Sequence, residues 1–341
     1  MANRKNKRKN IPIKISAKNP GVSGSCTVVT INDEITFVVD CGSYTDPGSI
    51  FKNYEPFDFD PKNIDFALIT HAHGDHTGQL PSLYKRGFEG NTYSTVDTKK
   101  ILTLSLRGNV DILRKEAEEL GETVLYDSND VNETLKNLKT CKFEESFTPY
   151  PGIEVTFYKN AHLIGAAIIV VKVSLKGYED TNIVFTGDYK EENIFFDVNN
   201  KLPDSVTKLP TIIVTEATYG NKDSGEIIPV FETDIQTQLK CAKLIVIFAF
   251  SLERTQTVIY RLKKMQEVGS LDENVKIFLD GKQAQQFTDL YRYSLDIRPE
   301  AKNFLPENFT KISKYETRDG IITANKGKYI CITPSGMADH G

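Results

Sequence analysis

The 341-residue sequence contains no apolar run that approaches the roughly 18 residues needed to span a bilayer. Its amino terminus also lacks the apolar stretch that follows the charged start of a secretory signal. Its five cysteines are scattered and form no C-x-x-C pair, which argues against a disulfide framework and against a cysteine zinc site. These absences predict a cytoplasmic protein whose cysteines are reduced and mostly structural.

Neither positive nor negative charge is in large excess: the net charge is −4 at pH 7. The overall balance therefore demands no nucleic-acid partner, and any such contact has to be local. The first ten residues concentrate lysine and arginine among asparagines, a composition that does not fold alone but can contact phosphates. We expect residues 1–11 to form a flexible basic tail, and we weigh a solvated end above a binding element.

Apolar patterning over residues 12–218 predicts alternating strands and helices, which is typical of an α/β fold. Residues 13–39 predict a hairpin or meander around the turn Asn32-Asp33. A strand at 66–70 runs directly into a cluster of histidines. The other elements expected here are helices at 98–120 and 131–138 and strands at 153–157, 166–173, 182–185 and 211–214.

From about residue 221 the pattern restarts and predicts a second α/β unit over residues 219–341. The elements expected here are strands at 243–250, 275–279 and 329–333 and helices at 255–267 and 283–293.

Three of the five histidines fall within the segment His71-Ala72-His73-Gly74-Asp75-His76. Along an extended segment His71 and His73 face the same side, while Asp75 and His76 follow at the turn and can reach a neighbouring point. Nitrogen and oxygen ligands without thiolate suit Zn²⁺, with Mn²⁺ or Fe²⁺ as substitutes. The segment therefore predicts a metal site on the loop that follows a strand.

Two further residues complete the expected ligand set. His162 is a polar residue that interrupts apolar sequence between two expected strands. Asp188 ends another expected strand, at the carboxyl edge where α/β folds place their sites. Each signal is weak alone, but together with the histidine segment they predict a buried metal centre.

The chain resembles the metallo-β-lactamase superfamily over nearly all of residues 12–218, because Asp40, the segment 71–76, His162 and Asp188 follow the order of its metal-site motifs. The resemblance implies an αββα sandwich with an inserted α/β cap, and an Asp40 carboxylate that orients a ligand. The metal ligands that it implies are His71, His73 and His162 for one ion, Asp75 and His76 for the other, and Asp188 as the bridge. Two such cations supply hydroxide for hydrolysis, with Asp75 placed to steer or accept the proton.

The segment Thr215-Glu216-Ala217-Thr218-Tyr219-Gly220 resembles motif A of the β-CASP nucleases. In that family the acid supports the active site, so the resemblance implies a catalytic role for Glu216. Residues 248–256 resemble the β-CASP strand-to-helix turn, in which Arg254 and Gln256 match. Glu253 and Thr257 replace the usual glycine and glutamate, which puts a tight turn and one acidic contact in doubt.

Two later segments extend the resemblance. Residues 277–281 followed by Ala284 look like the next cap strand and helix. Residues 333–337 resemble the family's Ser-Gly-Met loop, which lies near the substrate phosphates in relatives. Together with Arg254, the resemblance implies Ser335 and Gly336 as substrate contacts, since backbone donors in such turns bind phosphate.

The amino-acid sequence of residues 70–73, 78–81 and 163–167 resembles that of the RNA-processing branch of the β-CASP family. This branch includes the cleavage and polyadenylation endonuclease and ribonuclease J. The resemblance implies a ribonuclease that hydrolyses RNA phosphodiester bonds with a two-zinc-activated hydroxide. RNA is then the expected partner, with DNA the weaker fit, no membrane, and a homodimer or an RNA-processing complex as assemblies.

Two alternatives stay open. A thioester or lactone hydrolase would use the same metals but would not need Glu216 and Arg254. A catalytically silent RNA-processing scaffold would tend to lose metal ligands, and every ligand assignable before residue 218 is present.

The family normally continues beyond the Ser-Gly-Met loop and returns to finish its first domain, adding two histidines. His340 lies too close to Met337 to take either role, and we expect it to be a surface residue. The resemblance implies a cap that is incomplete at its carboxyl end and a first domain that lacks its closing strands. Such a core predicts an exposed sheet edge with apolar surface, and a chain that is poorly active alone.

Overall fold

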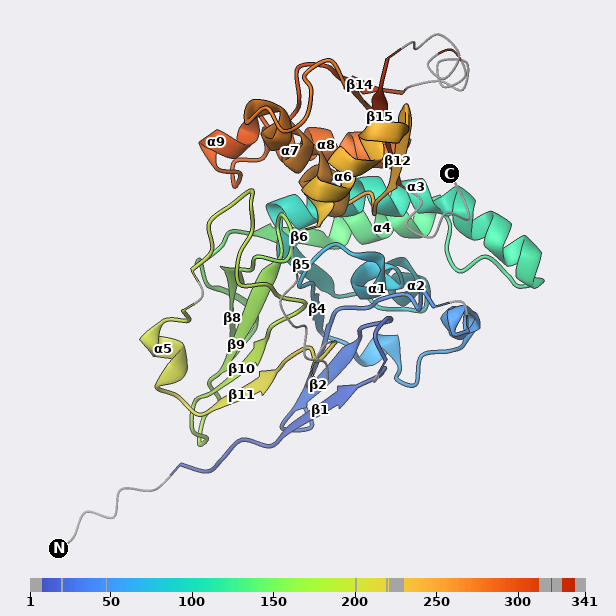
Figure 1. The fold of residues 1–341 in the computed structure, drawn as a ribbon. Coiled ribbons are helices and arrows are strands. Elements are labelled where there is room, and N and C mark those ends of the chain that lie inside the picture. The colour runs from blue at the N-terminus through green and yellow to red at the C-terminus, as the bar shows by residue number, and fades with distance from the viewer. Residues whose placement is uncertain are drawn as a thin grey trace, which may run out of the picture. The chain divides into compact units, whose positions relative to one another are not determined.

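The computed structural model describes residues 8–19, 21–46, 48–199, 201–218, 220, 230–312, 320 and 327–334. The chain divides into two compact units (Figure 1). The first comprises Met1–Asn193 and Asp197–Thr218, and the second comprises Ile194–Phe196 and Tyr219–Gly341.

The first sheet of the first unit has the strand order β1-β2-β3-β4-β5-β6. Its first three strands are antiparallel, and β3 to β6 are parallel. The strands are β1 (Ile13–Ala17), β2 (Thr27–Ile31), β3 (Ile35–Val39), β4 (Phe66–Leu68), β5 (Asn91–Thr95) and β6 (Leu138–Cys141). The expected meander is confirmed, and its turn residues Asn32 and Asp33 take φ values of 53° and 55°, a left-handed conformation that Asn and Asp tolerate well.

The second sheet of the first unit has the order β11-β10-β9-β8-β7, antiparallel except for the parallel pair of β10 and β11. Its strands are β7 (Phe147–Tyr150), β8 (Ile153–Lys159), β9 (Ala167–Val173), β10 (Thr181–Phe185) and β11 (Thr211–Val214). The four strands expected in this region are confirmed, and β7 is additional.

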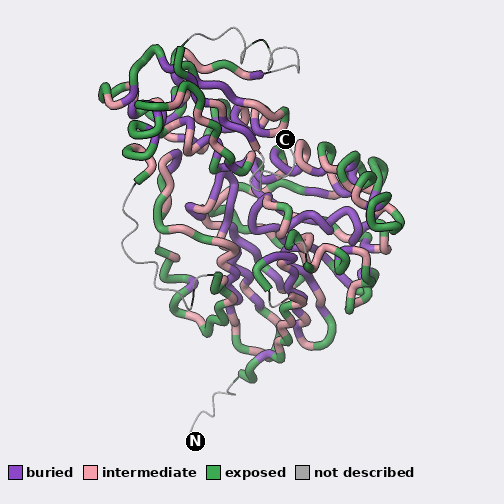
Figure 2. The backbone as a smooth tube through the Cα atoms, turned by 45° about the vertical axis from the view of Figure 1, so that its right-hand side comes forward, coloured by how far each residue is buried: buried purple, intermediate pink, exposed green. Residues whose placement is uncertain are grey.

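The core of the first unit lies between the two sheets, where Phe37 and Phe66 of the first sheet share one cluster with Phe157 and Ile169 of the second. Figure 2 shows buried chain running along these strands. The helices are α1 (Gly74–Thr77), α2 (Leu80–Lys85), α3 (Val96–Leu120), α4 (Ser128–Asn137) and α5 (Asp204–Thr207). Helices α3 and α4 pack against β5 and β6, and Val206 of α5 packs on the outer face of the second sheet. The expected αββα sandwich is confirmed.

Residues 8–11, which we expected in the flexible tail, are paired with the first unit. The Lys9 backbone donates to Gly177 and accepts from Glu179, at 3.3 and 2.9 Å. Ile11 is buried in the core between the sheets. Residues 8–11 therefore belong to the first unit, because the buried Ile11 side chain and the backbone pairing of Lys9 fix this segment.

The second unit contains a parallel sheet with the order β12-β15-β13-β14. Its elements are α6 (Phe231–Cys241), β12 (Leu244–Phe248), α7 (Arg254–Glu267), β13 (Lys276–Leu279), α8 (Lys282–Tyr293), α9 (Pro299–Lys302), β14 (Phe309–Lys311) and β15 (Tyr329–Thr333). The expected strands and helices are confirmed, and α6, α9 and β14 are additional. No helix in the described part of the chain is both long and apolar enough to cross a membrane.

The strand-to-helix turn before α7 forms although Glu253 stands where relatives carry glycine. Glu253 has a φ of 68° and is buried. The Tyr291 hydroxyl donates a hydrogen bond to its carboxylate. The doubt about this turn is thus resolved, because a buried hydrogen bond holds a backbone conformation that is unfavourable for a non-glycine residue.

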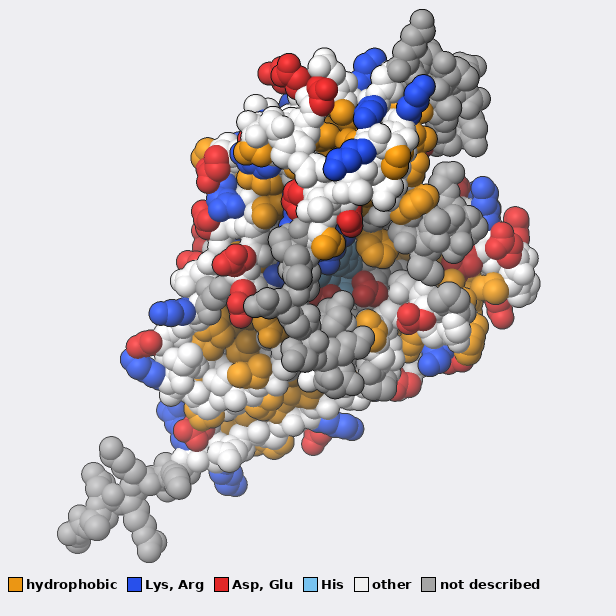
Figure 3. Space-filling view, in the orientation of Figure 1, with side chains coloured by type: hydrophobic (Ala, Val, Ile, Leu, Met, Phe, Trp, Pro, Cys, Tyr) orange, Lys and Arg blue, Asp and Glu red, His pale blue; other side chains and the backbone are white. Residues whose placement is uncertain are grey.

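Strand β11 forms one edge of the second sheet in the first unit. Ile212 and Ile213 are adjacent in the strand and therefore point to opposite faces, yet both are exposed, at 37% and 65%. Figure 3 shows hydrophobic side chains gathered over this part of the unit. These two side chains therefore leave apolar surface at this edge of the sheet.

The loop after β3 is fastened along its length to the segment that carries the histidines. Cys41 N–H donates to the His76 carbonyl at 2.8 Å, and Ser43 N–H donates to the Gly74 carbonyl at 3.0 Å. Between them, a Cβ atom added at Gly42 would lie 1.6 Å from the Asp75 carbonyl oxygen. Only glycine therefore permits this close approach of two backbone segments.

We predict that Gly42→Ala destabilises the protein by about 1–3 kcal/mol, because the added methyl group forces the two segments apart. Urea unfolding measured by circular dichroism gives the free energy of unfolding. Gly48→Ala is the matched control, since nothing lies within 4 Å of a Cβ atom there, and it should change stability by less than about 0.5 kcal/mol. Equal effects of the two variants would contradict the role assigned to Gly42.

Candidate metal centre

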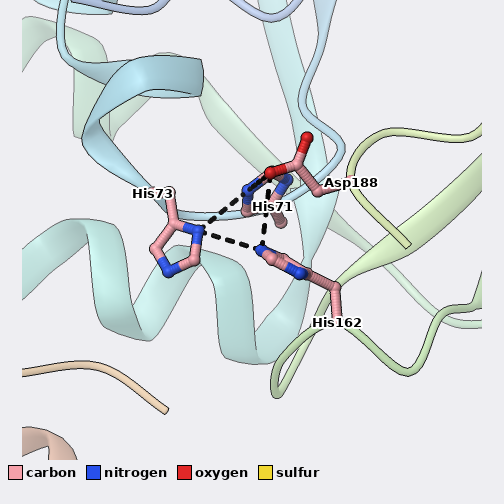
Figure 4. Close-up of side chains that lie close together, drawn as sticks. All are labelled: His71, His73, His162 and Asp188. Carbon is pink, nitrogen blue, oxygen red and sulfur yellow. Dashed lines mark hydrogen bonds and ion pairs between the residues drawn. The ribbon is translucent and has the colours of Figure 1, made fainter. Parts of the chain in front are cut away.

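Four side chains of the first unit converge on one point (Figure 4). One ligand atom from each of His71, His73, His162 and Asp188 lies within 4.8 Å of the other three. His73 Nδ1 is 3.1 Å from His71 Nε2 and 3.0 Å from His162 Nε2. Asp188 Oδ2 is 4.0 Å from His71 Nε2 and 3.7 Å from His162 Nε2. These separations bracket the about 3.3 Å expected between ligand atoms around a tetrahedral zinc ion with bonds of about 2.0 Å.

The four residues lie on segments that follow or connect strands at one end of the sandwich. His71 follows β4 of the first sheet, and His73 is the residue that precedes helix α1. His162 lies in the loop between β8 and β9, and Asp188 follows β10. The two sheets thus contribute ligands from both sides, as the positions of these residues after strands predicted.

Asp40 and Thr70 orient the His71 ring. Thr70 donates to Asp40 through its N–H at 2.8 Å and through its hydroxyl at 2.7 Å. Since the hydroxyl proton is used by the carboxylate, the Thr70 oxygen accepts from His71 Nδ1–H at 3.1 Å. His71 Nε2 is therefore the unprotonated nitrogen, and it faces the centre of the cluster.

Burial keeps the His71 and His162 imidazoles uncharged. Desolvation of the fully buried His71 ring lowers its pKa well below 6.5, and the neighbouring histidines add to this effect. Desolvation likewise lowers the pKa of His162 to about 3, with a further contribution from His73. Uncharged imidazoles with converging nitrogens are the form that binds a metal ion.

His76 lies beside the cluster and next to its member Asp188, where the second ion was predicted. His76 Nδ1 donates to Asp40 Oδ2 at 2.8 Å, and its Nε2 lies 3.3 Å from Asp188 Oδ1. Burial alone would lower the pKa of His76, but the Asp40 carboxylate and the bonds to both aspartates raise it to about 10. His76 Nε2 thus points at the carboxylate that was predicted to bridge the two ions.

Asp75 lies on the first turn of α1, close to the same charges. Burial raises the pKa of its carboxyl, His76 opposes this effect, and the negative charges of Asp188 and Asp40 add to it. The compact four-residue group does not include Asp75. Its expected role as a ligand and proton acceptor therefore stays a prediction.

Asn160 holds two of the ligand-bearing loops together, and the sequence analysis missed it. Its Oδ1 accepts from the His162 N–H at 2.8 Å. Its Nδ2 donates to the carbonyl oxygens of Thr186 at 3.0 Å and Asp188 at 2.7 Å. The side chain is 2% exposed. The only sequence signal was a second polar residue two positions before His162.

Glu216 fastens the backbone next to Asp188. Its carboxylate accepts from the N–H of Tyr189 at 3.1 Å and of Thr218 at 3.4 Å. A cavity of about 360 Å³ in the first unit is lined by Glu216 together with Asp40, His76 and Asp188, a volume in the range of small-ligand sites. Glu216 therefore lies at the cavity next to the metal centre, as the predicted supporting role requires.

The predicted substrate contacts lie in the second unit. Arg254 is the first residue of α7, and it is exposed. Gln256 is buried and donates to Ser251 O and Thr288 Oγ1, so it stabilises the turn. Ser335 and Gly336 lie outside the described residues. The roles of Arg254, Ser335 and Gly336 in binding substrate stay predictions.

Comparisons with known proteins agree with this geometry. A family model of the metallo-β-lactamase superfamily matches residues 19–125, and a β-CASP domain model matches residues 255–341. A transcription termination factor FttA of Methanosarcina mazei is 31% identical over 94% of this chain and 51% of its own length. Its counterpart in Methanococcus maripaludis is 28% identical over 90% and 49%. Ribonuclease TTHA0252 of Thermus thermophilus is 28% identical over 74% and 54%. The chain thus spans about half the length of these relatives.

We predict that Asn160→Asp weakens zinc binding about 10–100-fold, the usual effect of changing a residue that orients ligands. The variant keeps the acceptor for His162 N–H but places a carboxylate oxygen against two carbonyl oxygens. Competition with a chromogenic chelator measures the affinity. Asn137→Ala on α4 is the control, because the hydrogen bonds of Asn137 stay within that helix. Unchanged affinity in Asn160→Asp would refute the role given to this side chain.

We also predict that the metal-free protein loses stability as pH rises from 6.5 towards about 10. Between these values folded His76 keeps a proton that the unfolded chain has released, so the unfolded state binds fewer protons and stability falls. His162, with its pKa lowered to about 3, has the opposite sign and lowers stability as pH falls below 6.5. Urea unfolding in the presence of a chelator, measured from below pH 6.5 up to about pH 10, tests both slopes.

The matched variant for this pH series is His76→Gln, which removes the alkaline slope and leaves the acidic one. A wild-type stability that is flat above pH 6.5, or an alkaline slope that His76→Gln retains, would be the contrary result.

Proposed function

Because the chain belongs to the metallo-β-lactamase superfamily and carries a β-CASP domain, we propose that it is a metal-dependent ribonuclease that hydrolyses RNA phosphodiester bonds. The observation that carries the proposal is the convergence of His71, His73, His162 and Asp188 within 4.8 Å. Relatives of this chain include proteins named as a ribonuclease and as a transcription termination factor, and both names fit an RNA substrate.

The donor set fits divalent metal ions, and we propose two zinc ions, with manganese or iron as substitutes. Uncharged nitrogens and a carboxylate without thiolate suit zinc. When bound, two such ions supply hydroxide at neutral pH and offset negative charge on the attacked phosphate. The residues that would hold them are His71, His73 and His162 for one ion, Asp75 and His76 for the other, and Asp188 for both.

The protein groups around the metals prepare the site for this reaction. Asp40 fixes the ring orientation of His76 directly and that of His71 through Thr70. Glu216 holds the chain that carries Asp188. The raised pKa of Asp75 makes its carboxylate a better proton acceptor. These groups need not move when substrate binds, which is the preorganisation that such reactions use.

We further propose that the chain acts on RNA in the cytoplasm, either as a homodimer or within an RNA-processing complex. The exposed isoleucines of β11 support an association, since a bare apolar sheet edge favours pairing with another chain. A thioester or lactone hydrolase would use the same metals, and a silent scaffold would hydrolyse neither kind of substrate. The test below separates these functions.

We predict that the zinc-loaded protein cleaves RNA, and that His73→Ala lowers cleavage by more than about 100-fold, since changes next to metal ligands alone cost about 10–100-fold. RNA and DNA labelled at either end identify the substrate and the direction of cleavage. His340→Ala is the control, because His340 is the one histidine that is not among the expected metal ligands. Metal content is measured on every sample.

Each outcome decides between the candidate functions. Cleavage of RNA with two bound metals per chain supports the proposal. Hydrolysis of a thioester or lactone without cleavage of nucleic acid would replace it with the small-molecule function. Bound metal without either activity, in the chain and in mixtures with RNA-processing partners, would favour the scaffold.

A further inference from the structure

Cys26 and Cys41 face each other across the hairpin that leads into the metal centre. Thr27 is paired with Val39, and Gly42 N–H donates to the Ser25 carbonyl at 2.9 Å. These two pairings enclose Cys26 on one strand and Asp40-Cys41 on the other. The side chains of both cysteines are buried, and neither forms a disulfide. The neighbouring Cys26 side chain and burial raise the pKa of the Cys41 thiol, and both cysteines line the same cavity of about 210 Å³.

Cys26 lines two cavities, which gives small molecules two routes to the pair. One is the cavity of about 360 Å³ that Asp40, His76 and Asp188 also line. The other, of about 210 Å³, is lined by both cysteines together with Tyr44 and Gln79. Cys26 is 9% exposed and Cys41 is 1% exposed. Cys26 is therefore the sulfur that a reagent meets first.

The backbone of Cys41 is tied to the groups that orient the metal ligands. Cys41 follows Asp40, whose φ of 60° is unfavourable for a non-glycine residue. Cys41 N–H donates to the His76 carbonyl at 2.8 Å, and its own carbonyl accepts from Gln79 N–H at 2.9 Å. A disulfide needs the sulfur atoms about 2.05 Å apart, closer than two sulfur atoms that are not bonded to each other can approach. Its formation therefore draws the chain at Cys41 towards Cys26 and moves Asp40.

We propose that Cys26 and Cys41 are a redox site that forms a reversible disulfide, and that this disulfide weakens the metal centre by displacing the Asp40 carboxylate. The inference rests on the metal centre of the proposed function. It fits a cytoplasmic protein, where disulfides are typically transient.

The oxidant is a low-molecular-weight disulfide, and the exchange balances in two steps. The Cys26 thiolate attacks one sulfur of the reagent, whose S–S bond breaks, and the first reagent thiol leaves with a proton. The Cys41 thiolate then attacks Cys26 Sγ and releases the second reagent thiol. The two cysteines lose two protons and two electrons in total, and the reagent gains both.

Peptide mapping shows whether the bond forms. Trypsin cuts after Lys18 and Lys52 and at no lysine or arginine between them, so both cysteines share one peptide. The full chain is incubated with oxidised glutathione without denaturant, alkylated and digested. The expected peptide carries no alkyl group and is lighter than the reduced peptide by two hydrogen atoms. Two alkyl groups, or glutathione retained on Cys26, would overturn the proposal.

Zinc affinity shows whether the bond acts on the metal centre. Chelator competition on reduced, oxidised and re-reduced protein should give an affinity about 10–100-fold weaker after oxidation, as for loss of a ligand-orienting group. Re-reduction should restore it. Cys26→Ala should keep the affinity of the reduced protein and show no response to oxidant. Cys241→Ser, which changes an exposed cysteine, should respond as the wild type does.

The remaining outcomes are distinct from a failure of the proposed function. A disulfide with unchanged zinc affinity overturns the coupling and leaves the ribonuclease proposal standing. A reduced protein that binds no zinc refutes the metal centre, while the peptide map still reports on the disulfide. Cys41→Ser is a second variant with the same expected loss of response, so that misfolding of Cys26→Ala does not decide the matter.

Discussion

The Asp40 carboxylate is buried and needs hydrogen-bond donors, and the geometry of the metal centre depends on the donors that it binds. It accepts from Thr70 N–H, from the Thr70 hydroxyl and from His76 Nδ1–H. A buried carboxylate without such partners would be strongly unfavourable. The backbone of Asp40 holds a left-handed conformation to reach all three donors. One carboxylate thereby sets the tautomer of His71 through Thr70 and that of His76 directly, so it orients ligands of both predicted metal ions.

The two sheets of the first unit meet at the same point for a related reason. Thr70 lies two residues after the end of β4 in the first sheet. Its carbonyl accepts a hydrogen bond from Ala167 N–H of the second sheet at 2.8 Å. A Cβ atom added at Gly187 would come within 2.8 Å of Thr70 Cβ, so the chain that carries Asp188 passes directly against Thr70. The site is thus assembled by backbone contacts between sheets, and the imidazoles enter a frame that already exists. This frame explains how the uncharged imidazoles of His71 and His162 are held close to each other.

The residues that the structure brings together could be singled out in the sequence because their chemistry is rare and local. Three histidines in six residues stand out in a chain with five, and a strand before them indicates a loop at its carboxyl end. Asn160 could not be predicted in the same way, because its function depends on contacts with residues 186 and 188 that only folding brings near. The strands β7 and β14 were missed because they are short and lie at sheet edges, where half-exposed residues weaken the apolar pattern. Glu253 was misleading in a different sense, since a tertiary hydrogen bond from Tyr291 supports a turn that local propensity disfavours.

The cysteines show where spacing stops being informative. Cys41 lies fifteen positions after Cys26, and spacing of that kind correctly excluded a C-x-x-C motif. The spacing did not reveal that the two cysteines lie on neighbouring segments of the meander, because the chain folds back at Asn32-Asp33 and brings the two strands into register. Asp40 directly precedes Cys41 in the chain, so the residue that must be held still for metal binding adjoins one that a second thiol can pull. A conformation that is already strained has little freedom to absorb such a pull. The disulfide and the ligand-orienting carboxylate therefore compete for one short piece of backbone, and only one of them can have its preferred geometry at a time.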